Sequence, residues 1–170
     1  LHQALCEGLK DSGAKVINIG MGPTPMTYFA HYHLKADAVI MVTGSHNPSE
    51  YNGFKMVLNK HSFYAHDILS LQKLIDQKEL KLVDGEIIHK DIKQNYVERL
   101  LKNINLNKKI KIAWDVGNGA MGTVIKEVVK NLNNSENILI NDKVDGNFPN
   151  HHPDPTVPKN MEQLKSIVKE

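Results

Sequence analysis

One serine stands in a turn-rich segment whose residue types suit chemistry on a phosphate group. Ser45 lies between Gly44 and the triplet His46-Asn47-Pro48, and it follows a wholly apolar run over residues 38–42. Glycine lets the backbone approach a ligand closely, and the Asn-Pro pair favours a fixed turn. A hydroxyl held beside exposed backbone N–H groups suits a phosphate, and Lys55 could place an ammonium near the same anion.

The same segment allows two other interpretations. One is a tight surface turn that contains a serine. The other is a serine hydrolase, but the nucleophile elbow of those enzymes has a glycine two residues after the serine, where this chain has Asn47. His46 is adjacent to Ser45 in sequence, and sequence neighbours do not by themselves make a catalytic triad.

The elements around the serine predict an α/β fold. A strand over residues 15–19, a helix over 26–34 and a buried strand over 38–42 form a βαβ unit, whose two strands pair in parallel through a right-handed crossover. Ligand chemistry collects in loops at the carboxyl ends of such strands, and the loop over 43–53 lies at such an end. The other elements predicted in this half are a helix that begins at Leu1 and ends near Ser12-Gly13, a strand over 53–58 and a helix over 66–77.

The second half repeats the order of helix and strand. Its predicted elements are a helix over 96–101, a strand over 111–115, a helix over 121–132, a strand over 138–140 and a closing helix over 160–169. Residues 78–93 mix charges with short apolar runs, which indicates a junction between domains. We therefore predict two similar βαβ-based units with mixed sheets in a three-layer α/β/α arrangement, with domains over 1–90 and 91–170.

A glycine-rich segment in the second half raises a rival function. Residues 117–122 have the G-x-G-x-x-G spacing of a dinucleotide-binding loop, carried by Gly117, Gly119 and Gly122, and Asp142 stands twenty residues further on. This pattern indicates an NAD-dependent oxidoreductase. Against it, Asp115 ends the preceding strand and would face the pyrophosphate, with a repulsion on the order of 1 kcal/mol.

Composition excludes several other classes. Of 170 residues 41% are hydrophobic and 24% charged, and 21 basic residues stand against 19 acidic ones. This balance gives no electrostatic basis for a nucleic-acid partner. The sequence has neither the run of about 18 apolar residues that a membrane helix needs nor a signal peptide. Because Cys6 is the single cysteine, we expect no intrachain disulfide. Because the sequence has neither a membrane run nor a signal peptide, we expect no membrane association and a cytoplasmic location.

Residues 43–55, Thr-Gly-Ser-His-Asn-Pro-Ser-Glu-Tyr-Asn-Gly-Phe-Lys, resemble the phosphoserine loop of the α-D-phosphohexomutases. The likeness is closest to the bacterial phosphomannomutase/phosphoglucomutase branch. Residues 22–25, 115–120 and 145–155 resemble further segments of that family, in order and at fitting spacing.

This resemblance implies an isomerase of the phosphotransferase type, which interconverts the 1-phosphate and 6-phosphate of mannose or glucose. Phospho-Ser45 would give its phosphoryl group to the hexose phosphate, and the resulting 1,6-bisphosphate would return the other phosphate to the serine. His46 and Lys55 match motif positions near the reacting group, where they would orient phosphate or substrate and assist proton transfer. Asn47 would fix the loop.

The resemblance also implies a Mg²⁺ ion, bound by a phosphate oxygen on Ser45 and by three aspartates. The family's Asp-Gly-Asp-rich metal loop does not occur in the sequence, so these aspartates are expected beyond Glu170. The sugar-recognition loop and the distal phosphate-binding loop are missing too, and Leu1 already lies in a helical pattern. We therefore expect a fragment with little or no mutase activity by itself; a non-catalytic truncated protein is the third hypothesis.

Overall fold

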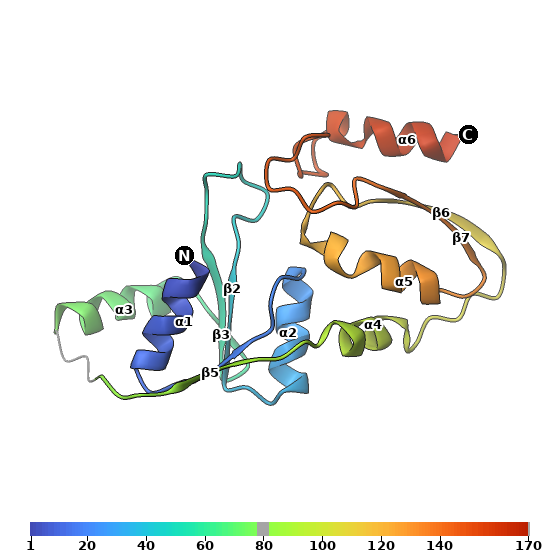
Figure 1. The fold of residues 1–170 in the computed structure, drawn as a ribbon. Coiled ribbons are helices and arrows are strands. Elements are labelled where there is room, and N and C mark those ends of the chain that lie inside the picture. The colour runs from blue at the N-terminus through green and yellow to red at the C-terminus, as the bar shows by residue number, and fades with distance from the viewer. Residues whose placement is uncertain (78–81, 170) are drawn as a thin grey trace. The chain divides into compact units, whose positions relative to one another are not determined.

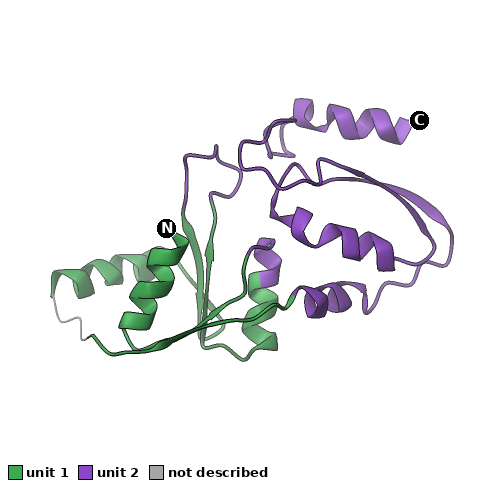
Figure 2. Ribbon diagram, viewed as in Figure 1, with its two compact units in different colours: residues 1–20, 27–43, 53–92 green, residues 21–26, 44–52, 93–170 purple. Residues whose placement is uncertain are grey.

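A computed structural model describes residues 1–77 and 82–169, which contain both helices and strands (Figure 1). Contacts divide the chain into two compact units (Figure 2). The first comprises residues 1–20, 27–43 and 53–92, and the second comprises 21–26, 44–52 and 93–170. The predicted α/β class, with mixed parallel and antiparallel pairing, is confirmed. Among the described helices, none has the length and apolar character needed to cross a membrane.

The first unit contains a parallel strand pair that the sequence did not predict. After α1 (His2–Asp11), β1 (Lys15–Asn18) pairs with β5 (Glu86–His89), with Lys15 opposite Glu86. The predicted parallel pairing of this strand with the strand over 38–42 is therefore wrong. The strand β5 lies in the segment 78–93 that the sequence indicated as a junction, of which residues 78–81 lie outside the described part of the chain.

The strand over 38–42 belongs instead to an antiparallel sheet. Following α2 (Thr24–His33), β2 (Ala38–Val42) pairs with β3 (Phe54–Leu58), and β3 pairs with β4 (His61–Phe63); α3 (His66–Asp76) follows. Asn59 and Lys60 connect β3 to β4 with φ values of 49° and 69°. Two successive positive φ angles are typical of the type I′ hairpin turn. A wholly apolar strand does not reveal its partner, which is why the periodicity of β2 left the pairing undetermined.

The second unit confirms the predicted βαβ arrangement. β6 (Ile110–Asp115) and β7 (Ser135–Ile140) pair in parallel, from Ile110 opposite Ser135 to Asp115 opposite Ile140. The connection is a 3₁₀ turn, η1 (Ala120–Thr123), followed by α5 (Ile125–Asn131), instead of one continuous helix. The unit also contains α4 (Lys93–Leu101), η2 (Pro158–Met161) and α6 (Glu162–Lys169).

Buried apolar side chains of α4, of α5 and of the two residues that flank α5 form much of this unit's core: Tyr96, Val97, Val124, Ile125, Val128 and Leu132. The buried positions in and beside α5 recur at helical spacing, as on the inner face of an amphipathic helix, and α5 packs against α4. The candidate site is built from the loop that follows β2 and from residues 150–155, which lie between β7 and η2.

Candidate functional site

The serine loop, residues 44–52, is folded onto itself by two short turns. The Asn47 N–H donates to the Gly44 carbonyl (3.1 Å), and the Tyr51 N–H donates to the Pro48 carbonyl (3.0 Å). A Cβ at Gly44 would lie 2.6 Å from the Tyr51 carbonyl oxygen, so only glycine fits there. Ser45 is exposed and has a φ of 57°, in the left-handed region that costs most side chains about 1 kcal/mol. The loop thus presents the serine in a defined backbone conformation.

The residues that flank the serine loop on both sides belong to the antiparallel sheet of the first unit. Val42 on β2 is opposite Phe54 on β3, and the Thr43 N–H donates to the Gly53 carbonyl (2.9 Å). Lys55 lies one residue further along β3, opposite Met41, and is exposed.

Three of the four predicted site residues, Ser45, His46 and Asn47, are brought together in the serine loop, which groups with the second unit. The fourth, Lys55, lies in the first unit. The assignment of Ser45, His46 and Lys55 to catalysis stays a prediction. So does that of Asn47 and Lys55 to substrate binding or loop positioning.

His46 makes a hydrogen bond that defines its tautomer. Its Nδ1 lies 2.5 Å from the Pro153 carbonyl oxygen. Because a carbonyl oxygen can only accept, Nδ1 must carry the hydrogen, and in the neutral ring Nε2 is then the nitrogen with the lone pair. The neutral ring of His46, which is next to Ser45 in sequence, can therefore accept a proton at Nε2.

Residues 150–155, which we call the support loop, are anchored by a histidine–carboxylate pair. His151 Nε2 lies 2.8 Å from Asp115 Oδ2, and His151 Nδ1 lies 2.9 Å from the His152 carbonyl oxygen. The carbonyl accepts, and so does an ionised carboxylate, so the geometry suits a ring that donates from both nitrogens, which is the imidazolium. The hydrogen bond to the His152 carbonyl raises the pKa of His151, and so do the hydrogen bond and charge of Asp115, while burial opposes them.

Asp115 is itself held firmly at the end of β6. Its side chain is 7% exposed, and Oδ1 accepts hydrogen bonds from the Gly117 N–H and from Asn141 Nδ2, both at 2.9 Å. From the sequence, Asp115 was noted only because its charge would repel a bound pyrophosphate. Its partner His151 is 36 residues away, and no local signal joins the two.

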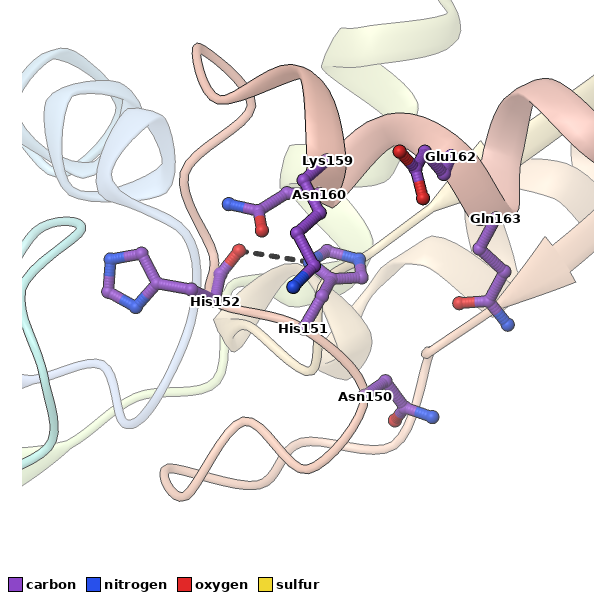
Figure 3. A pocket seen from close by; sticks show the side chains of 7 residues that line it. All are labelled: Asn150, His151, His152, Lys159, Asn160, Glu162 and Gln163. Carbon is purple, nitrogen blue, oxygen red and sulfur yellow. Dashed lines mark hydrogen bonds between the residues drawn. The ribbon is translucent and has the colours of Figure 1, made fainter.

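A polar surface pocket of about 430 Å³ lies beside this pair (Figure 3). The support loop contributes some of its lining, and η2 and α6 contribute the rest. The lining residues are Asn150, His151, His152, Lys159, Asn160, Glu162 and Gln163. The dashed line in Figure 3 marks the hydrogen bond from His151 to the His152 carbonyl. His151, one member of the pair that anchors the support loop, therefore also lines this pocket.

The glycine-rich loop does not have the geometry of a dinucleotide cradle. The N–H groups of Gly117, Asn118 and Gly119 are bonded to Asp115 Oδ1, to the Asn141 carbonyl and to the Val116 carbonyl. These amides are therefore not available to a pyrophosphate.

The acidic residue of that fingerprint is also engaged. Asp142 pairs with Lys126 at 2.9 Å, and this hydrogen bond is the main cause that lowers the pKa of Asp142. A Cβ at Gly122 would lie 2.3 Å from the Asp142 carbonyl oxygen. The glycine spacing therefore serves close packing between η1 and the chain after β7, as expected for a tight turn.

The predicted Mg²⁺ site cannot be assembled from the described residues alone. Within residues 1–77 and 82–169, no group of three or more His, Cys, Asp or Glu side chains could hold a metal ion. Mg²⁺ prefers carboxylate and phosphate oxygens, so these residues do not fit the ion without further ligands.

The His151–Asp115 pair predicts a pH dependence of stability. Because folding raises the pKa of His151, the pair stabilises the fold fully below the pKa of free imidazole, about 6.5, and this contribution is lost as pH rises through the raised value. Trp114, the only tryptophan in the sequence, neighbours Asp115 and can report unfolding by fluorescence. We expect the free energy of unfolding to fall as pH rises above about 6.5, and to fall less in His151→Gln.

The matched control is His152→Gln, which changes the adjacent imidazole and leaves the anchor in place. It should keep the pH dependence of the unmodified protein. Equal pH profiles for His151→Gln and the unmodified protein would show that the pair does not titrate as described.

Comparison with known proteins identifies the family. Residues 1–81 match the family described as phosphoglucomutase/phosphomannomutase, alpha/beta/alpha domain I, and residues 94–170 match its domain II. The chain belongs to the phosphoglucomutase/phosphomannomutase family.

Individual members of the phosphoglucomutase/phosphomannomutase family agree along the whole chain. A phosphomannomutase/phosphoglucomutase of Pseudomonas putida is 40% identical over 100% of this chain and 36% of its own length. A phosphoglucomutase of Neisseria gonorrhoeae is 39% identical over 99% of this chain and 37% of its own. The crystal structure of a family member from Burkholderia thailandensis superposes with a TM-score of 0.90 at 38% identity, covering 99% of this chain and 38% of that one. The chain therefore spans a little over a third of the length of these relatives.

Proposed function

We propose that this chain supplies the phosphoryl-carrying serine of a hexose-phosphate mutase. The observation that carries the proposal is the serine loop: an exposed Ser45 in a left-handed backbone conformation, at the closed end of a hairpin, in a chain of the phosphoglucomutase/phosphomannomutase family. A hydroxyl held in this way can carry a phosphoryl group without the entropy cost of ordering its loop at each reaction.

The proposed reaction has two phosphoryl transfers. In the first, a hydroxyl oxygen of the hexose phosphate attacks the phosphorus of phospho-Ser45, the bond from phosphorus to the serine oxygen breaks, and the hydroxyl proton passes to a base. In the second, the serine oxygen attacks the other phosphate of the bisphosphate, and a proton returns to the leaving sugar oxygen. We assign orientation and proton transfer jointly to His46 and Lys55, and loop fixation to Asn47.

The tautomer of His46 supports its part in this scheme. With Nδ1 donating to the Pro153 carbonyl, Nε2 of the neutral ring is free to accept the hydroxyl proton. Lys55 would contribute positive charge toward the phosphoryl oxygens. Mg²⁺, when bound, would neutralise charge on those oxygens. Within this chain, we propose that only the phosphate on Ser45 would be a ligand of the ion.

The substrate and the context are proposed from the names of the relatives. Those names include phosphoglucomutase and phosphomannomutase, so we propose glucose and mannose 1- and 6-phosphates as substrates and a 1,6-bisphosphate as intermediate. We also propose a cytoplasmic location and two domains, over 1–90 and 91–170. Because the relatives are more than twice as long, we propose that residues 1–170 alone turn over little or no substrate.

Mass spectrometry of a tryptic peptide tests the proposed carrier. Cleavage after Lys35 and Lys55 releases residues 36–55, which contain both Ser45 and Ser49. After incubation of the whole protein that carries this chain with glucose 1,6-bisphosphate, we expect a phosphate on Ser45 and none on Ser49. A peptide without phosphate, or with phosphate on Ser49 alone, would refute Ser45 as the carrier.

A further inference from the structure

We propose that the support loop, residues 150–155, is a positioning element for the serine loop, and that it acts through the hydrogen bond from His46 to the Pro153 carbonyl. This inference rests on the proposed function, because it concerns the loop that would carry the phosphoryl group. All residues that carry it lie in the second unit.

The first anchor of the support loop is the ion pair between His151 and Asp115. It ties residue 151 to the end of β6 at 2.8 Å, with both side chains largely buried, at 17% and 7% exposure. Asp115 cannot turn away easily, since its other oxygen holds the Gly117 N–H and the Asn141 amide. Breaking a buried pair of this kind on one side is costly, so this anchor is stiff.

The second anchor lies on the other side of Pro153. Asp154 Oδ1 accepts hydrogen bonds from the Thr156 N–H (2.9 Å) and from the Thr156 hydroxyl (2.7 Å). The buried Asn160 donates from Nδ2 to the Asp154 carbonyl (2.8 Å), and the Asp154 N–H donates to the His152 carbonyl (2.8 Å).

Pro153 is thus fixed from both sides, and its own ring locks φ. Its carbonyl is therefore a preset acceptor with little freedom to reorient. The hydrogen bonds from the Thr156 hydroxyl and N–H are the main causes that lower the pKa of Asp154.

This preset acceptor has two consequences for the serine loop. It selects the tautomer of His46 with hydrogen on Nδ1, and it removes rotational freedom from the residue next to Ser45. An exposed side chain such as His46 would otherwise sample several rotamers. The support loop therefore sets which nitrogen of His46 faces the chemistry, before any substrate binds.

Nitrogen-15 NMR of His46 tests this without relying on turnover. Spectra of the protein labelled at histidine are recorded at about pH 8.5, where an unperturbed imidazole is neutral, and His46 is assigned by its loss in His46→Asn. We expect hydrogen on Nδ1 of His46 in the unmodified protein and a mixture of tautomers in His151→Leu. A spectrum of the unmodified protein without hydrogen on Nδ1 would overturn the proposal.

A matched pair of substitutions tests the functional consequence. The amide nitrogen of asparagine can occupy the place of Nδ1 and still donate to the Pro153 carbonyl, whereas the longer glutamine places its amide nearer the place of Nε2. His46 is exposed, so neither variant should disturb folding. With glucose 1,6-bisphosphate as phosphoryl donor, we expect Ser45 to be phosphorylated about tenfold faster in His46→Asn than in His46→Gln, the factor that one hydrogen bond provides.

Failure of this inference is distinguishable from failure of the proposed function. If Ser45 takes up phosphate and both His46 variants do so at the same rate, the carrier stands and the positioning role is wrong. If Ser45 takes up no phosphate in any form of the protein, the proposed function is wrong, and the tautomer measured by NMR still decides whether the support loop holds His46.

Discussion

Replacing Ser45 with alanine should lower kcat for the interconversion of hexose 1- and 6-phosphates by about 10⁴-fold or more, the scale on which enzymes lose rate with their nucleophile. The physical reason is that the proposed reaction uses the serine oxygen twice, once as leaving group and once as attacking atom. No proton relay or positioning residue can substitute for that covalent carrier. The measurement is steady-state turnover of the protein that carries this chain, with glucose 1-phosphate as substrate.

Ser49→Ala provides the matched control, because Ser49 is a second exposed serine in the same loop. It should keep kcat within about twofold, as substitutions of exposed side chains usually do. If Ser45→Ala retains full turnover, or if both alanine variants lose it equally, Ser45 is not the phosphoryl carrier.

Replacing Asp115 with alanine should destabilise the second unit by about 1–3 kcal/mol, the cost of leaving hydrogen-bonding groups in a largely buried place without their partner. The substitution leaves the His151 imidazole without its carboxylate and deprives the Gly117 N–H of its acceptor, while Asn141 keeps its bond to Gln163. Each group left buried without a partner adds its own desolvation cost. Denaturant unfolding followed by Trp114 fluorescence measures the loss.

Two further substitutions serve as controls for the Asp115→Ala result. Asp115→Asn keeps an oxygen acceptor in nearly the same place and should lose less stability than Asp115→Ala. Asp76→Ala removes an exposed carboxylate at the end of α3 and should change stability by less than about 0.5 kcal/mol. A loss for Asp115→Ala no greater than that for Asp76→Ala would mean that the pair does not hold the unit together.

Local sequence signals predicted the parts of the fold that depend on near neighbours. The β6–β7 pair was predicted from two strands with a helix between them. The structure confirms the parallel pair, with η1 and α5 as its connection. The pairing of β2 was wrong, because an apolar strand fits a parallel or an antiparallel neighbour equally well. β4 went unnoticed, since its Asn59-Lys60 turn lacks the glycine that usually signals a two-residue hairpin.

The candidate site divides in the same way. The serine loop was predictable because its residues are contiguous, and its family likeness adds the chemistry. The support for that loop was not predictable: Pro153 is 107 residues from His46, and His151 is 36 residues from Asp115. Sequence spacing predicts contacts within a turn or a helix, whereas these contacts depend on the tertiary fold.

The parallel pairing of β1 with β5 has a consequence for how the chain folds during synthesis. The two strands are separated by about seventy residues, so closing them costs more entropy than closing β6 on β7, and pairs of such separation form slowly. A nascent chain must carry the edge of β1 unpaired until β5 has left the ribosome. Mutations that delay the synthesis of residues 86–89, or that weaken their pairing with β1, should therefore reduce the yield of protein through aggregation.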